Sequence, residues 1–268
     1  MYDRFNRKIT YLRISVTDRC NLRCTYCMPE EGIKLKRHED ILSYEEIVRV
    51  AREAVELGIH KFRLTGGEPL VRKNIIQLVR ELKKINGLKE LSMTTNGVLL
   101  SLFAWELRQA GLDRLNISLD TLKPEKYRKI TRVGDIENIF SGIDAALKAG
   151  FSGTKLNMVL IPGFNTDEVE KMKEFCRNKG FALQRINHYS LEERCSIQSE
   201  YQAERPLDCS QCNRIRLTAD GKLKPCLFSD REIPVNMKDI GLSLKKAILA
   251  KPREGTSCFS RENWQIGG

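Results

Sequence analysis

The stretch Cys20–Cys27 reads CNLRCTYC and comes directly after an apolar run that predicts a β-strand. Its cysteines, Cys20, Cys24 and Cys27, can supply three thiolates from one short loop. A [4Fe–4S] cluster ordinarily takes four thiolates, one for each iron, so these three would leave one iron open. An open coordination position is what a catalytic metal centre needs. A structural zinc site is the alternative, but zinc would require a fourth ligand close by, and His38 matches that role poorly.

Outward from this loop, one unit recurs: a strand, a loop, a helix, and a glycine before the next strand. Six such units predict a parallel sheet, because parallel neighbours need crossover connections. Right-handed crossovers can close into a barrel or open into a doubly wound sheet, and periodicity alone leaves that choice open. The predicted strands are Tyr11–Val16, Lys61–Thr65, Glu90–Thr94, Arg114–Leu119, Lys155–Ile161 and Ala182–His188.

Helix ends are marked by capping residues and glycines. Ser43 with Glu46 predicts a capping box, and Asn165 with Glu168 predicts a related helix start. The predicted helices of the repeating part are Tyr44–Leu57, Ile75–Ile85, Leu100–Gln109, Ile136–Lys148 and Glu168–Asn178.

Two further motifs follow predicted strands. Gly66–Pro69 reads GGEP after the second strand, and Asn116–Asp120 reads NISLD at the fourth. Together with the cysteine loop and its aromatic Tyr26, they resemble the radical S-adenosylmethionine (SAM) superfamily. The resemblance implies an α/β fold, a partial (βα)6 TIM-type barrel with a [4Fe–4S] cluster at its mouth. It also implies SAM contacts from Tyr26, Gly67 and Ser118.

A second cysteine group lies far along the chain: Cys209, Cys212 and Cys226. It again supplies three thiolates, which suit a second iron–sulfur cluster; a zinc ribbon with a missing ligand and an electron-transfer cluster are the alternatives. Between these cysteines, strand alternation puts Arg214 and Arg216 on one face. Arginine forks of this kind suit phosphate recognition.

This second stretch resembles the GTP 3′,8-cyclase family within the superfamily. The resemblance implies conversion of GTP to 3′,8-cyclo-7,8-dihydro-GTP by a 5′-deoxyadenosyl radical, the first step of molybdenum cofactor (molybdopterin) biosynthesis. It implies two [4Fe–4S] clusters, with SAM at the first and the GTP purine at the second. No side chain is assigned as a catalytic acid or base. The GTP-binding residues that carry over are Arg13, Arg63, Thr94, Lys155, Arg214, Ile215 and Arg216.

Three features depart from that family. The segment before Cys209 is shorter than usual, and the sixth strand has Gln184, Asn187 and Tyr189 where the family has arginine, acidic and methionine positions. The tail, WQIGG, is close to the family ending without matching it. These departures leave open a related radical SAM enzyme with an auxiliary cluster that acts on another nucleotide, a peptide or RNA. A two-cluster electron carrier is the other alternative, although it would not need a GGEP loop.

The closing pair Gly267-Gly268 is expected to thread a narrow channel toward the radical site, because glycine has no side chain to clash there. The residues ahead of it also form a predicted hairpin, Ile215–Thr218 and Leu223–Leu227 around an Asp-Gly turn, and a predicted helix, Leu242–Ala250.

Length and composition indicate the domain organisation, the charge of a partner and the cellular compartment. The 268 residues suffice for one domain with an appendage, predicted as a barrel over 1–190 and an auxiliary-cluster extension over 191–268. A net charge of +11 favours an anionic partner: nucleic acid, an acidic surface or a polyphosphate. The nine cysteines, with no apolar signal segment or membrane-length run, predict a reducing cytoplasm and no membrane contact. Cys176, Cys195 and Cys258 are expected to be incidental thiols.

The reaction that the resemblance implies would also require partners. One electron must reach the first cluster, so a one-electron donor such as flavodoxin or ferredoxin is expected. The next enzyme of pterin synthesis would receive the product. A homodimer is left open by the sequence.

Overall fold

The computed structural model describes residues 1–192, 203–204 and 208–266, and these residues form a nine-stranded sheet. Six of its strands lie in chain order, each parallel to the next. No boundary differs from the predicted strand by more than one residue. The six strands are β1 (Tyr11–Ser15), β2 (Lys61–Thr65), β3 (Glu90–Thr95), β4 (Arg114–Ser118), β5 (Lys155–Leu160) and β6 (Ala182–Asn187).

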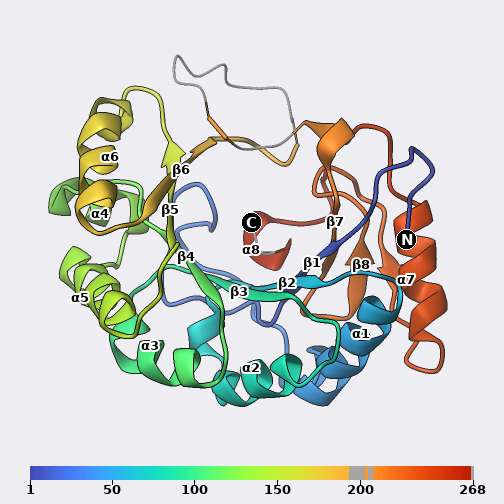
Figure 1. Cartoon of the computed structure of the whole chain (residues 1–268). Coiled ribbons are helices and arrows are strands. Elements are labelled where there is room, and N and C mark those ends of the chain that lie inside the picture. The colour runs from blue at the N-terminus through green and yellow to red at the C-terminus, as the bar shows by residue number, and fades with distance from the viewer. Residues whose placement is uncertain (193–202, 205–207, 267–268) are drawn as a thin grey trace.

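Helices cover the convex side of this curved sheet, as Figure 1 shows for α1, α2, α3, α5 and α6. A doubly wound sheet would carry helices on both faces, so the architecture is the expected partial (βα)6 barrel. The helices are α1 (Tyr44–Glu56), α2 (Ile75–Lys83), α3 (Leu100–Gln109), α4 (Pro124–Thr131), α5 (Ile136–Lys148), α6 (Val169–Asn178), α7 (Ile240–Leu249) and α8 (Asn263–Ile266). Short 3₁₀ turns cover His38–Asp40, Pro69–Val71, Thr166–Glu168 and Cys209–Gln211.

The C-terminal part extends the same sheet. β7 (Arg214–Leu217) pairs in parallel with β1, and β8 (Lys222–Lys224) and β9 (Ile233–Pro234) continue antiparallel beyond it. The predicted hairpin and tail helix are therefore confirmed, the latter as α7. Gly221 has φ +77°, as the Asp-Gly turn requires. The division at residue 190 stays a prediction.

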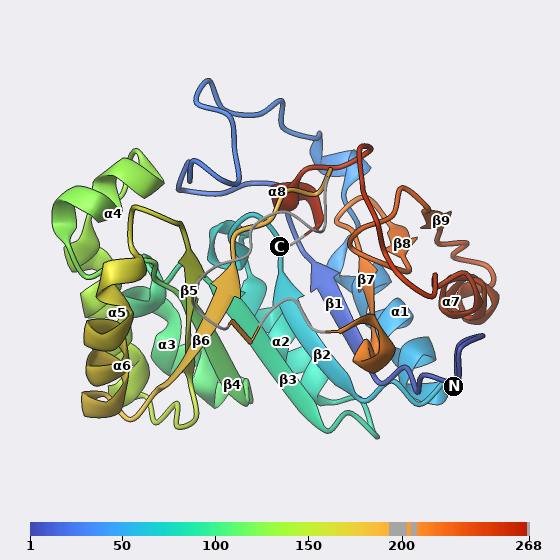
Figure 2. The same cartoon turned by 90° about the horizontal axis from the view of Figure 1, so that it is seen from above.

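Figure 2 shows from above which helices lie at the two ends of the sheet. α6 packs beside β6 at one end, while α7 packs beside β8 and β9 at the other. α8, near the described end of the chain, lies on the concave side of the sheet between these ends (Figure 1). The C-terminal segment thus returns to the mouth of the barrel.

The two faces of the parallel strands differ in chemistry. On β1, Leu12 and Ile14 are fully buried in the hydrophobic core, whereas Arg13 between them lines a cavity. Since side chains alternate along a strand, the core side faces the helices and the polar side faces the barrel interior. The functional site is therefore expected on the concave side.

One helix start agrees with the sequence and one does not. The capping box of Ser43 and Glu46 is present, with both side-chain bonds made. Asn165, however, makes no cap bond. Its side-chain oxygen, the atom that a cap would use, accepts instead from the Ile161 amide at 2.8 Å, and its amide nitrogen donates to the carbonyls of Asp120 and Val159, at 2.8 Å each. These bonds occupy the side chain of Asn165, so α6 begins without this cap.

Among the described residues, no helix is both long and apolar enough to span a bilayer.

Candidate active site

Two cavities lie inside the barrel. The first cavity has a volume of about 190 Å³ and is lined by the first trio, Cys20, Cys24 and Cys27. The GGEP loop at the end of β2 and Ser118 at the end of β4 also line it. All three motifs that suggested SAM binding therefore converge on one cavity.

The GGEP loop lies against the chain that enters the cysteine loop. The Gly67 amide donates to the Thr17 carbonyl at 2.9 Å, and the Glu68 amide donates to the Arg19 carbonyl at 2.8 Å. A Cβ at Gly67 would lie 2.3 Å from the Arg19 carbonyl oxygen, which no side chain can tolerate. Glycine is therefore required here by the close approach of two backbones.

Glu68 ties three segments together around the first cavity. Its buried carboxylate accepts from the Leu70 amide at 3.0 Å, the Thr95 hydroxyl at 2.8 Å and the Asn96 amide at 2.7 Å. The Asn96 side chain in turn donates to the Asn21 side chain, inside the cysteine loop, at 2.7 Å. Burial raises the pKa of Glu68 to about 7 against the lowering effect of these donors.

Tyr26 is the only aromatic residue within Cys20–Cys27, and its hydroxyl donates to Asp120 Oδ2 at 2.7 Å. Asp120 Oδ1 accepts from the Val159 amide at 2.8 Å. Burial raises the pKa of Asp120 to about 6, although both hydrogen bonds work against the shift. The pair fixes the cysteine loop to the ends of β4 and β5.

The cysteines of the first trio are half-buried, and their surroundings disfavour the thiolate form. Burial raises the pKa of Cys20, raises that of Cys24 well above the ordinary range, and raises that of Cys27 to about 12. Because thiolates, not thiols, bind metals, loading this site must release protons. Positive charge brought by iron would supply the compensation that the apolar surroundings lack.

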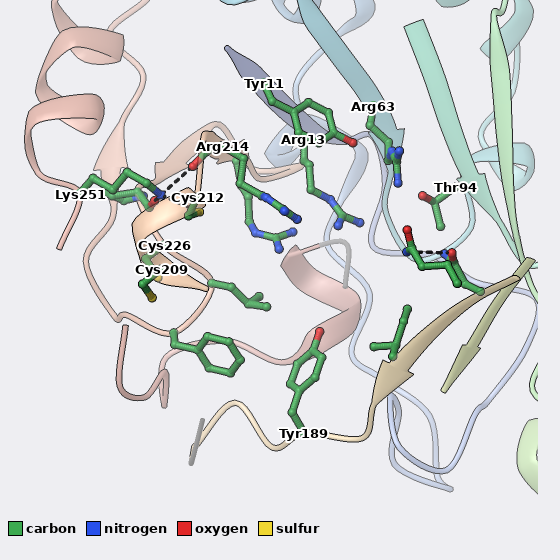
Figure 3. A pocket seen from close by; sticks show the side chains of 17 residues that line it. Tyr11, Arg13, Arg63, Thr94, Tyr189, Cys209, Cys212, Arg214, Cys226 and Lys251 are labelled. Carbon is green, nitrogen blue, oxygen red and sulfur yellow. Dashed lines mark hydrogen bonds between the residues drawn. The ribbon is translucent and has the colours of Figure 1, made fainter. Parts of the chain in front are cut away.

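The second cavity has a volume of about 140 Å³ and contains the second trio, Cys209, Cys212 and Cys226, together with arginines from several strands. Strand register explains the arginine row: Arg13 on β1 stands opposite Arg63 on β2 and opposite Arg216 on β7. Figure 3 shows Arg13 and Arg63 pointing into the cavity from the sheet, with the second trio on its other side.

The arginine row gives the cavity a strong positive charge. Burial lowers the pKa of Arg13 well below its ordinary value, and the nearby guanidinium groups of Arg216 and Arg63 lower it further. The ring of Tyr11 lies beneath two guanidinium groups, with its centroid 5.6 Å from Arg63 Cζ and 5.9 Å from Arg214 Cζ. An anion with several oxygens is the ligand that suits this arrangement.

The second trio differs electrostatically from the first. Burial raises the pKa of the Cys226 thiol. Burial also acts to raise the pKa of Cys212, but the Lys251 ammonium and the Arg214 amide outweigh it and bring the pKa below the ordinary value. Cys212 therefore becomes a thiolate, the form that binds metals, more readily than Cys226 does.

The two cavities meet. Thr94, Asn157, Ile186 and Tyr189 line both of them. The Thr94 hydroxyl is buried and has no hydrogen-bond partner in the described part of the chain. A buried polar atom without a partner costs free energy unless a ligand satisfies it, so the junction suits a bound molecule with hydrogen-bonding groups.

Most of the predicted site residues line one of the two cavities. The exceptions are Lys155, which lines neither, and Ile215, whose side chain is fully buried in the hydrophobic core. Ile215 alternates with its two arginine neighbours along β7, so its side chain points to the opposite face. The residues found at the cavities are Cys20, Cys24, Cys27, Tyr26, Gly67, Ser118, Arg13, Arg63, Thr94, Arg214, Arg216, Cys209, Cys212 and Cys226.

The three residues that depart from the family pattern on and just after β6 are also at the cavities. Gln184 donates to Asn157 Oδ1 at 3.1 Å and lines the second cavity. Asn187 lines the first cavity, and its Oδ1 is buried with no partner that the described residues provide. Tyr189 packs edge-on against Phe228, with 5.4 Å between ring centroids.

Several cavity residues were missed by the sequence analysis. Phe228 and Lys251 line the second cavity, and Asn263 and Trp264 on α8 line the first. Trp264 belongs to the WQIGG ending, which was the available signal. Lys251 follows directly after a predicted helix, with no local pattern to mark it.

Some residues that carry sequence-based expectations lie outside the described part of the chain. Gly267-Gly268 and Cys195 lie outside the described residues, so the threading of the tail stays a prediction. Cys176 and Cys258 are buried free thiols, as expected for incidental cysteines.

The residues present fit the groups that the sequence suggested. Each trio consists of free cysteines that face one cavity, and the first cavity contains a loop where only glycine allows close approach. Buried polar atoms of Thr94 and Asn187 without partners among the described residues face these spaces. Among the described residues no group of three cysteine, histidine or carboxylate side chains is arranged to hold a single metal ion. Three thiols around one cavity suit a larger group, such as an iron–sulfur cluster.

Sequence comparison defines the class first: the model of the radical SAM superfamily matches residues 14–176, and the chain is a radical SAM protein. Such proteins bind a [4Fe–4S] cluster and SAM. Solved structures agree on the fold: one described as native anSMEcpe with bound AdoMet has a TM-score of 0.66 at 17% identity, covering 91% of this chain and 81% of that one. Streptococcus suis SuiB bound to S-adenosylmethionine has a TM-score of 0.62 at 16% identity, covering 82% and 60%.

More similar relatives narrow the class. The model described as Molybdenum Cofactor Synthesis C matches residues 170–247. A GTP 3′,8-cyclase of Moorella thermoacetica is 46% identical, with 88% of this chain and 86% of the relative covered. Another, from Peptoclostridium acidaminophilum, is 43% identical over 100% of this chain and 98% of the relative. The chain belongs to the GTP 3′,8-cyclase family.

Proposed function

We propose that this chain converts GTP to 3′,8-cyclo-7,8-dihydro-GTP, the first step of molybdenum cofactor biosynthesis. The observation that carries the proposal is the meeting of the two cavities, one lined by the first trio and the other by the second trio and the arginine row. Since Thr94 and Tyr189 line both, a reactive group in one cavity lies next to a substrate in the other. Membership of the cyclase family points to the same reaction.

In the first cavity we assign the first trio to a [4Fe–4S] cluster, and Tyr26, Gly67 and Ser118 to SAM. Once bound, these two groups would supply radical chemistry, in the form of a 5′-deoxyadenosyl radical able to take a hydrogen atom from C3′ of the substrate. The side chains and backbone of the protein position these two groups. Gly67 permits a close backbone approach, Ser118 presents a hydroxyl at the end of β4, and Tyr26 holds the loop through Asp120.

In the second cavity we assign GTP. Guanidinium forks bind phosphate oxygens in pairs, and the neutral hydroxyl of Thr94 can hydrogen-bond the ribose near the junction of the cavities. Ile215 can take part through its backbone, because its side chain lies in the core. Lys155 keeps its place as a prediction from the family resemblance. The proposed GTP-binding residues are Arg13, Arg63, Thr94, Lys155, Arg214, Ile215 and Arg216.

We assign the second trio, Cys209, Cys212 and Cys226, to a second [4Fe–4S] cluster, which would supply a binding position for the purine. Fixing the base there would keep C8 close to C3′ of the same molecule. Proximity of this kind can lower a barrier by several kcal/mol (about 7 or more in favourable systems). Apolar walls such as Phe228 and Ile186 line the space and exclude water from the radical.

The remaining assignments extend this proposal. We place the enzyme in the cytoplasm, with a flavodoxin or ferredoxin as electron donor and the next enzyme of pterin synthesis as the recipient of the product. The barrel over 1–190 and the auxiliary-cluster extension over 191–268 are kept as the proposed domains, and a homodimer remains an open arrangement.

The test is anaerobic incubation of the reconstituted protein with SAM, dithionite and one nucleotide at a time. GTP is expected to be consumed with matching formation of 5′-deoxyadenosine, whereas ATP is expected to remain intact. Consumption of ATP at the same rate, or SAM cleavage that leaves GTP unchanged, would contradict the proposed substrate.

A further inference from the structure

Lys251 is a buried cation beside the second trio. It lies two residues after the end of α7, and only 3% of its surface is exposed. Its amide donates to the Ile248 carbonyl at 3.2 Å, and α7 packs against α1, β8 and β9. The backbone of Lys251 is therefore fixed at the edge of the second cavity.

All three donors of the Lys251 ammonium are used. Nζ lies 3.2 Å from Cys212 Sγ, 2.8 Å from the Arg214 carbonyl and 2.9 Å from the Pro225 carbonyl. Figure 3 shows the ammonium of Lys251 beside Cys212 and bonded to the carbonyl of Arg214. Because an ammonium has only three N–H groups, none is left for a substrate. Lys251 must act through its neighbours.

These contacts join two separate chain segments. Arg214 follows Cys212 by two residues, and Pro225 immediately precedes Cys226. Lys251 thus holds both segments at a fixed separation. In addition, Arg7 donates to the Cys209 carbonyl at 2.7 Å.

Arg7 and Lys251 are linked along the chain as well. Arg7 also donates to the carbonyls of Pro252 and Arg253, at 2.6 and 3.0 Å, directly after Lys251. Arg7 contacts only backbone oxygens of this segment, whereas Lys251 reaches the sulfur of a trio member. Both cations hold chain segments of the trio, but of the two only Lys251 contacts a sulfur and can alter its electronic state.

Charge gives this contact a second consequence. A three-thiolate site concentrates negative charge in a buried place, and a buried cation at a sulfur offsets it. Hydrogen bonds to sulfur and nearby positive charge also favour the reduced form of an iron–sulfur cluster, because reduction adds negative charge.

We propose that Lys251 is a positioning residue for the second cluster, one that fixes the second trio and raises the cluster's reduction potential. This inference rests on the proposed second cluster. It assigns to Lys251 no contact with GTP or SAM.

The experiment uses the full chain with Cys20, Cys24 and Cys27 all replaced by alanine, so that only the second trio can hold a cluster. In this parent, Lys251→Met removes the charge and the donors, while Lys251→Gln keeps N–H donors without the charge. After anaerobic reconstitution, iron content, the rate of iron loss to a chelator and the midpoint potential are measured.

Lys251→Met is expected to lose iron about tenfold faster and to have a more negative midpoint potential than the parent. Lys251→Gln is expected to fall between them. A Met variant with the parent's potential and iron retention would overturn the proposal. If the Met variant does not fold, as judged by circular dichroism, the test passes to the Gln variant. A Gln variant with the parent's potential and iron retention would then overturn the proposal.

Lys224→Met is the matched control, because Lys224 is a fully buried lysine on β8 whose ammonium contacts the Ser229 carbonyl and Cys258 rather than the trio. It is expected to keep the parent's potential. A shift as large as that of Lys251→Met would show a general effect of buried charge and overturn the specific role. A parent that takes up no iron would instead refute the second cluster itself, and both proposals would fall together.

Discussion

Arg13 on β1 and Arg216 on β7 stand directly opposite each other, and both side chains line the second cavity. They are 8% and 4% exposed, so two like charges are held together largely away from water. The charge of Arg216 lowers the pKa of Arg13, and a phosphate group bound between the two guanidinium groups would interact favourably with both. The parallel pairing of β7 with β1 is what creates this arrangement, because it brings the C-terminal arginines alongside the first strand.

Replacing Arg216 tests this arrangement. Arg216→Ala is expected to weaken GTP binding by about 1.5–3 kcal/mol, the contribution of a charge-assisted hydrogen bond to phosphate. SAM affinity should stay the same, since Arg216 does not line the first cavity. Calorimetric titration with each ligand measures both. Arg177→Ala, an exposed site on α6, is the control for net charge. Unchanged GTP affinity in the Arg216 variant would rule out its proposed role.

The two trios predict the metal content. Reconstituted protein should contain about eight irons per chain, and a variant with Cys209, Cys212 and Cys226 replaced by alanine should contain about four. That variant should still cleave SAM slowly but form no cyclised nucleotide. Elemental analysis distinguishes the outcomes, and zinc bound at the second trio in place of iron would contradict the account.

The burial of Asp120, which accepts a hydrogen bond from Tyr26, predicts a pH-dependent stability. The unfolded chain releases the Asp120 proton near its ordinary pKa, whereas the folded chain keeps it until about pH 6. The free energy of unfolding therefore falls as pH rises through this window. Tyr26→Phe removes a donor to the charged form and raises this pKa further.

Urea unfolding measures the consequence. The variant should be less stable than wild type by about 1–3 kcal/mol at about pH 8 and by much less at about pH 5, where Asp120 is protonated in both. A destabilisation that is equal at both pH values would show that Tyr26 acts by packing alone.

Two glycine substitutions test whether glycine is required at a position because a side chain would clash there. Gly67→Ala is expected to abolish SAM binding, because its Cβ would lie 2.3 Å from the Arg19 carbonyl. Gly241→Ala, in α7, is the control, since its Cβ would meet only the flexible Glu53 carboxylate at 3.1 Å. The control should be as stable as wild type or more so, by up to about 1 kcal/mol. SAM titrations and thermal unfolding check both, and normal SAM affinity in Gly67→Ala would contradict the close-approach argument.

Arg261 is expected to hold the segment that leads to α8. Its guanidinium bonds to Asp220 at 2.9 Å and to Glu232 at 2.8 Å, and it is largely buried. Arg261→Ala leaves both carboxylates without this partner, so local opening of the segment should become easier by about 3 kcal/mol. Hydrogen exchange should rise in Thr256–Ile266 and SAM affinity should fall, because Trp264 lines the first cavity. Unchanged exchange in that segment would refute the anchoring role.

The repeating part of the fold could be predicted because its signals are local. Each strand is an apolar run, and each is followed by a helix with its own cap or glycine. The pairing of β7 with β1 could not be predicted, because a four-residue strand carries no sign of a partner some two hundred residues away. Asn165 shows the same limit: its sequence context favours a cap, but its side-chain oxygen accepts from the Ile161 amide and its amide nitrogen donates to the carbonyls of Asp120 and Val159.

The site divides in a similar way. Cysteine spacing and the GGEP loop identified the first cavity, because metal ligands and close backbone approach demand particular residues at particular spacings. Lys251 and Arg7 were missed because their roles arise from burial and from contacts between distant segments. Lys155 was carried over from the family by residue type, and residue type does not determine whether a side chain reaches a cavity.

Turnover of GTP that carries deuterium at C3′ tests the central claim most directly. If the chain in fact removes hydrogen from that carbon, anaerobic reaction with SAM and dithionite will transfer the label, and the 5′-deoxyadenosine formed will be deuterated as GTP is consumed. Mass spectrometry of the nucleoside reads the result. Unlabelled 5′-deoxyadenosine, formed while GTP remains intact, would contradict the account.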